Sequence, residues 1–87
     1  MTRKPPTPGH PGSMIRAWLA QSGWKQTRLA RELGLSQKHM SQLTLGIVNL
    51  SPRVALDLER VTGIPAEVWA VADVMYRLTQ LRHEVTP

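Results

Sequence analysis

The sequence predicts an all-α domain of five helices without a sheet. Between residues 13 and 83, apolar side chains recur at spacings of three and four, which is typical of amphipathic helices. No segment alternates with period two for long enough to form a strand. Glycine or proline interrupts the helical pattern between successive segments, as expected at helix ends.

The chain of 87 residues is long enough for one domain only. It contains no cysteine, which excludes a disulfide framework and a cysteine zinc site. Residues 1–12 include four prolines and two glycines, so we expect a flexible basic arm there. The domain itself is predicted to span residues 13–83, followed by a tail of residues 84–87.

The first helix is predicted to begin with Ser13 as its cap and to end at Gly23. Its apolar residues fall at positions i, i+3 and i+4, which places them on one face. These residues are Ile15, Trp18 and Leu19.

The second helix is predicted over residues 25–33, with Gly34 as a left-handed stop. A short third helix follows, capped by Ser36 and stopped by Gly46. The turn between them is too tight for antiparallel packing, so the two helices must cross steeply. Their inward residues are predicted to be Leu29, Ala30, Leu33, Leu35, Met40 and Leu43.

The fourth helix begins at Ser51 and Pro52, which combine a capping hydroxyl with proline at the first helical position. Gly63 closes it, and Pro65 opens a fifth helix that is predicted to reach about His83. At 1.5 Å per residue this last helix is about 28 Å long. The inward residues of the fourth helix are Val54, Ala55, Leu58 and Val61.

The net charge of +5 is concentrated in the first half of the chain. Residues 14–46 contain five basic residues against one acidic residue, whereas residues 65–87 contain two against three. This asymmetry favours one half that faces a polyanion and another that packs or pairs. A solvated basic surface is the alternative interpretation of the charge alone.

In the predicted third helix, every residue outside the inward-facing apolar set is polar. Amides pair with adenine, lysine with guanine, and hydroxyls with either, so these side chains are of the types that contact base edges or phosphates. They are Gln37, Lys38, His39, Ser41 and Gln42.

Residues 26–43 (QTRLARELGLSQKHMSQL) resemble the helix-turn-helix of the XRE, or lambda-repressor-like, family. Residues 63–69 (GIPAEVW), together with Pro11-Gly12 and residues 50–52, resemble the HigA-type antitoxin branch in particular. The resemblance covers about residues 11–80 and implies a five-helix lambda-repressor-like DNA-binding domain. It also implies partners of two kinds, double-stranded DNA and a small ribonuclease toxin.

The resemblance assigns roles to residues at matching positions. Base recognition is expected from Gln37, Lys38, Ser41 and Gln42, with His39 and Thr44 at the margins. Phosphate contacts are expected from Gln26, Asn49, Ser51 and the amides that follow it. Lys25 is also expected to contact phosphate, because it lies at the same edge of the second helix. The sequence departs from the family pattern at Lys25, where Ser or Thr is usual, at Leu45, where Asn is frequent, and at residues 47–49, which lack the usual basic charge.

The fifth helix has an apolar stripe wider than the other four helices can cover. A surplus of this kind favours an interface, and a two-fold homodimer would place two third helices about 34 Å apart. The predicted interface comprises Trp69, Ala72, Met75 and Tyr76. Alternatively, the helix folds back fully on its own domain. Ile47 and Val48 are either a second contact patch or a local plug.

Several functions lack candidate residues. The three histidines have no spacing typical of metal ligands, and no catalytic pair stands out, so we expect neither metal, cofactor nor enzymatic activity. The tryptophans are expected to pack in the core or an interface in preference to stacking on single strands. No segment predicts a signal peptide or a membrane span, so the expected location is cytoplasmic and nucleoid-associated.

The sequence thus predicts a dimeric, sequence-specific repressor of its own operon, and the resemblance implies a second role as an antitoxin that neutralises a toxin. Two alternatives remain at this stage. One is a phage-type or Cro-like regulator without a toxin. The other is a protein-interaction module that has lost DNA binding, which the uncharged residues Ile47 and Val48 favour.

Overall fold

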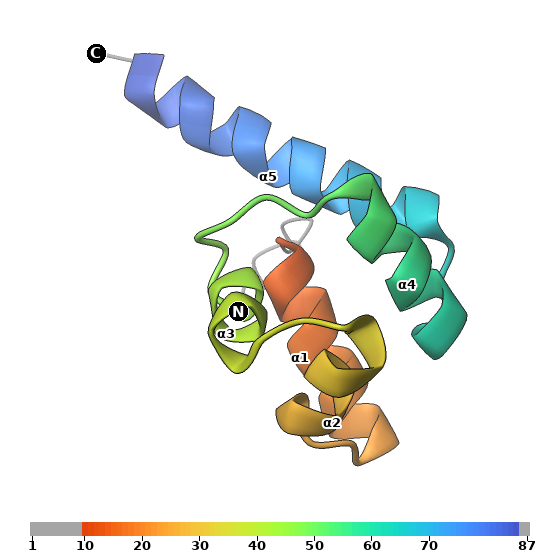
Figure 1. The fold of residues 1–87 in the computed structure, drawn as a ribbon. Coiled ribbons are helices and arrows are strands. Elements are labelled where there is room, and N and C mark those ends of the chain that lie inside the picture. The colour runs from red at the N-terminus through yellow and green to blue at the C-terminus, as the bar shows by residue number, and fades with distance from the viewer. Residues whose placement is uncertain (1–9, 86–87) are drawn as a thin grey trace, which may run out of the picture.

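The computed structural model describes residues 10–85, which form five helices (Figure 1). Within this range there is no strand, as the sequence predicts. The helices are α1 (Pro11–Ser22), α2 (Gln26–Leu33), α3 (Gln37–Thr44), α4 (Pro52–Thr62) and α5 (Ala66–Val85).

The start of α1 differs from the prediction. The helix begins at Pro11, with His10 as the preceding residue, so Ser13 is helical and does not act as the cap. Proline at the first helical position is itself a start signal because its missing N–H has no partner there. Pro11 and Gly12 are buried parts of this helix, although the sequence placed them in the arm. Residues 1–9 of the predicted arm lie outside the described residues.

The other helix boundaries follow the local signals. The hydroxyl of Ser36 accepts a hydrogen bond from the His39 amide at 3.0 Å, and that of Ser51 accepts one from the Val54 amide at 3.1 Å. These contacts confirm both predicted caps. Gly34 follows α2 with a φ of +69°, which allows the chain to turn sharply into α3.

The core lies where α1–α4 meet the first half of α5. It holds the predicted inward residues of α2, α3 and α4, with α5 packed mainly along α4. The N-terminus of α5 is also fixed by Glu59, whose carboxylate accepts a hydrogen bond from the Ala66 amide at 2.8 Å. The largest fully buried side chains are Trp69, Ile15, Leu29, Met40 and Leu58.

Helices α1 and α3 approach each other closely at Gly12. A β-carbon at this position would lie 2.2 Å from the carbonyl oxygen of Thr44, which is too short for any real contact. Arg16, one turn further along α1, donates a hydrogen bond from Nη1 to the same carbonyl. The end of α3 is therefore held against the start of α1.

The second half of α5 extends past the other helices, towards the upper left of Figure 1. Side chains from Leu78 to Glu84 are exposed, which agrees with this projection. No helix within residues 10–85 is both long enough and apolar enough to cross a membrane.

Candidate nucleic-acid interface

Helix α3 presents a polar outer face and an apolar inner face. Gln37 and Lys38 are exposed at its N-terminal end. His39, Ser41 and Gln42 are half-buried, and all retain surface accessible to solvent. The inward residues Met40 and Leu43 are buried, so they fix the helix while the polar residues stay outside.

One predicted base-contacting residue lies elsewhere. Thr44 is 5% exposed, and its hydroxyl donates a hydrogen bond of 2.8 Å to the carbonyl of Ser41. Because its side chain and its carbonyl are both engaged inside the protein, Thr44 is a structural residue at the end of α3. The structure corrects its assignment to base recognition.

The first turn of α2 lies beside the outer face of α3. Gln26 donates a hydrogen bond from Nε2 to the hydroxyl of Ser41 at 3.4 Å. Lys25, immediately before this helix, is exposed. The structure thus brings a predicted phosphate contact, Gln26, next to a predicted base contact, Ser41.

The N-terminus of α4 contributes a second group of polar atoms. Asn49 and Ser51 are exposed in the segment that connects α3 to this helix. The Ser51 hydroxyl is already engaged as the cap, so an anion here would meet the free amides of the first turn and the positive end of the helix dipole.

Arg53 was not among the phosphate contacts expected from the sequence, although it lies exposed in the same first turn of α4. It lies two residues after the Ser51 cap, at a helix N-terminus of the kind that binds anions.

A cluster of aromatic rings supports the start of α2. The rings of Trp18 and Trp24 meet edge to face, with centroids 5.1 Å apart, and both pack against the core. The guanidinium of Arg28 lies 3.7 Å from the centre of the Trp24 ring. Trp69 is fully buried. The three tryptophans therefore pack, as expected, and Arg28 stacks on one of them.

His10 lies between α1 and α5. Its ring is 4.9 Å from that of Tyr76. Burial, and then repulsion from Arg16 and Arg77, lower the pKa of His10 below its ordinary value. The imidazole is thus favoured in its neutral form beside the end of α3.

The predicted dimer interface is corrected at two positions. Trp69 has no exposed surface and Ala72 is 8% exposed, so both belong to the core of the single chain. Tyr76 is half-buried against Gly46, whereas Met75 is accessible. Helical periodicity indicated one wide apolar stripe on α5 but did not show which part of it faces inwards.

The face of α5 opposite the core is also apolar. Its large exposed side chains fall within roughly 140° of arc, given 3.6 residues per turn. We call them the outer stripe: Val68, Val71, Val74, Met75, Leu78 and Leu81. An exposed apolar band of this kind is typical of an interaction surface.

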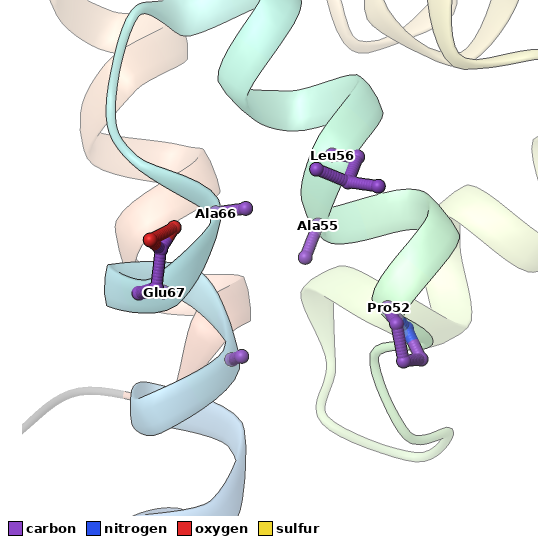
Figure 2. A pocket seen from close by; sticks show the side chains of 6 residues that line it. Pro52, Ala55, Leu56, Ala66 and Glu67 are labelled. Carbon is purple, nitrogen blue, oxygen red and sulfur yellow. The ribbon is translucent and has the colours of Figure 1, made fainter.

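An open groove of about 280 Å³ lies between α4 and α5 (Figure 2). In Figure 2, the side chains of Ala55 and Ala66 point towards each other across it. Leu56, at its edge, is largely exposed. The groove extends the apolar surface of α5 onto α4, and its lining consists of Pro52, Ala55, Leu56, Ala66, Glu67 and Ala70.

A short capped helix that presents polar side chains, braced by the preceding helix across a glycine turn, defines the helix-turn-helix class of DNA-binding domains. Residues 15–69, well over half of the chain, match the HTH_3 helix-turn-helix family. The chain belongs to this family.

A solved structure has the same fold over nearly the whole chain. It is described as an addiction module antidote protein of a HigA family from Coxiella burnetii. The TM-score is 0.72 at 21% sequence identity, and the match covers 92% of this chain and 97% of the other. A comparison with curated proteins gives no match.

Proposed function

We propose that this protein is a homodimeric, sequence-specific transcription repressor that binds the promoter of its own operon. The observation that carries the proposal is the outer face of α3. Gln37 and Lys38 are exposed there, with Ser41 and Gln42 accessible beside them, while Met40 and Leu43 anchor the helix. This arrangement suits a helix whose polar residues enter the major groove.

Binding to the chain's own upstream DNA, measured by fluorescence anisotropy, tests this proposal. Affinity should fall steeply as salt rises, because phosphate contacts release counterions. Gln37→Ala and Gln42→Ala should each weaken the specific site by about 1–3 kcal/mol and leave random duplex binding nearly unchanged. Gln21→Ala, an exposed amide on α1, is the matched control.

Two outcomes would contradict the DNA-binding proposal. Equal weakening on every sequence would remove the base-contacting role of Gln37 and Gln42. Absence of duplex binding at low salt would favour a protein-interaction module, an alternative supported by the 63% exposure of both Leu45 and Ile47 beside α3.

The proposed dimer pairs the outer stripe of one chain with that of a second copy. Val71 lies near the middle of the stripe and is 59% exposed. Val71→Glu should shift the mass measured by light scattering from dimer to monomer, because a buried carboxylate at the interface is unfavourable. Ala20→Glu, on an exposed part of α1, should leave the dimer intact. A wild-type monomer at micromolar concentration would exclude the dimer.

We further propose an antitoxin role, in which the protein neutralises a small ribonuclease toxin. The shared fold with the HigA-family antidote and the resemblance of residues 63–69 support this role. Expression of the adjacent small gene should arrest growth, and co-expression of this chain should restore it. A neighbouring gene without toxicity would favour a Cro-like regulator instead.

A further inference from the structure

Residues 45–51 connect α3 to α4, and a side chain from α5 holds their path. Arg77 donates hydrogen bonds from Nη1 to the carbonyl of Gly46 at 3.0 Å and from Nη2 to the carbonyl of Val48 at 2.5 Å. One guanidinium therefore binds two carbonyls that are two residues apart. Its planar, forked geometry suits this double contact.

Asp73 and Tyr76 fix the position of Arg77 and of the loop. The Asp73 carboxylate is buried and lies 3.5 Å from Arg77 Nε. The Tyr76 ring packs so tightly on Gly46 that a β-carbon there would lie 3.1 Å from its hydroxyl oxygen. Three residues of one α5 segment thus support the loop from the side of the core.

The loop has few backbone contacts of its own. Its last described backbone hydrogen bond before α4 runs from the Ile47 amide to the Gln42 carbonyl, within the turn that ends α3. The next one is donated by Ala55 to the Ser51 carbonyl, inside the first turn of α4. The Arg77–Val48 contact lies between these two backbone hydrogen bonds and holds the residue directly before Asn49.

We propose that Arg77 is a positioning residue for DNA binding, which fixes Asn49 and the N-terminus of α4 relative to α3. This inference rests on the proposed DNA-binding function, because Asn49 and the α4 amides are its phosphate-contacting groups. Arg77 does not touch DNA in this arrangement, since its guanidinium is engaged by the loop and by Asp73. It acts through the backbone that it holds.

Arg77→Lys tests the inference because it keeps the charge but removes the two-pronged contact. Amide hydrogen exchange at Ile47, whose amide is bonded to the Gln42 carbonyl and which lies between the two carbonyls that Arg77 binds, should become about tenfold faster, as expected for the loss of a hydrogen bond from a charged group. Binding of random duplex by the folded protein should weaken, whereas the slope of log affinity against log salt should stay the same, because Asn49 and the α4 amides carry no charge. A general loss of stability would lower the active fraction, measured by titration at saturating DNA, without changing the affinity of the folded protein.

Arg60→Lys is the matched control. Arg60 also donates from its guanidinium to a distant backbone carbonyl, that of Glu32, at 2.7 Å, but this contact joins α4 to the end of α2. It should leave both the duplex affinity of the folded protein and the exchange of the Ile47 amide unchanged. If Arg77→Lys does not fold, Asp73→Asn replaces it, and faster exchange of the same amide is again expected.

The outcomes separate the inference from the proposed function. Unchanged exchange of the Ile47 amide overturns the inference on its own, as does faster exchange with an unchanged duplex affinity of the folded protein. If the wild-type chain binds no duplex at low salt, the proposed function fails and takes the inference with it.

Discussion

Gln26 and Ser41 join the first turn of α2 to the middle of α3 through a hydrogen bond between Nε2 and Oγ at 3.4 Å. The contact connects an expected phosphate-binding position with an expected base-contacting position. Because Gln26 is half-buried, its amide is held over the outer face of α3 instead of turning freely in solvent. The two residues should therefore act together when DNA binds.

A double-mutant cycle measures this cooperation. Gln26→Ala and Ser41→Ala should each weaken binding to the specific site, and the double variant should lose less than the sum. The expected coupling is about 0.5–1 kcal/mol, typical of residues in direct contact. Losses that add to within about 0.3 kcal/mol would show that the hydrogen bond has no role in the complex.

Ser51 allows stability to be separated from DNA binding. Ser51→Ala should lower the free energy of unfolding by about 1 kcal/mol, because the cap of α4 is lost. Ser51→Asp keeps a capping oxygen and should preserve stability, but it places a negative charge where we expect a phosphate. Urea unfolding and anisotropy with random duplex measure the two effects. Wild-type affinity in Ser51→Asp would mean that this helix terminus does not face the DNA backbone.

Gly12→Ala should destabilise the fold, although alanine is the better helix former. The new methyl group would lie 2.2 Å from the Thr44 carbonyl oxygen and must push α1 and α3 apart. We expect a loss of about 1–3 kcal/mol in the free energy of unfolding, as for overpacked cores. Gln21→Ala, at an exposed position of the same helix, should change stability little. A more stable Gly12→Ala would refute the close approach.

His10 should make stability depend on pH. Burial and two arginines lower its pKa in the folded chain below the ordinary value of 6.5, so the unfolded chain binds a proton more readily. Stability should therefore fall as the pH drops below about 6.5 towards the lowered folded-state pKa, and it should be recovered above that range. Melting temperatures of wild type and His10→Phe, compared from pH 7.5 to 5, measure this contribution. Parallel curves would contradict it.

The features that the sequence predicted correctly have local causes. Ser36 and Ser51 cap their helices through an amide three residues away, and Gly34 ends α2 through its own φ. Such signals need no knowledge of distant contacts. The outer position of Gln37 and Lys38 followed from the same local periodicity, since Met40 and Leu43 occupy the inner face.

The errors and omissions have long-range causes. Trp69 was assigned to an interface because the apolar stripe of α5 is too wide for the other helices to cover, and only packing, mainly against α4, decides which part of it is buried. Thr44 is buried because Gly12 packs closely on its carbonyl and Arg16 donates a hydrogen bond to it. These two residues lie 32 and 28 positions earlier in the chain. The contacts of Arg77 with the loop were also missed, since its carbonyl partners lie about 30 residues away. The pairing of Asp73 with Arg77 one turn later, amid apolar residues, was the available hint.

The inward and outward residues of α3 lie on separate faces, so the outward side chains can change without disturbing the inward ones. Met40 and Leu43 secure the helix, whereas Gln37, Lys38 and Gln42 make no contact that the core requires. Exchanging these outer side chains should leave folding intact while altering which operator is preferred. If the proposed function holds, a few surface substitutions on α3 should be enough to change the DNA target of this scaffold.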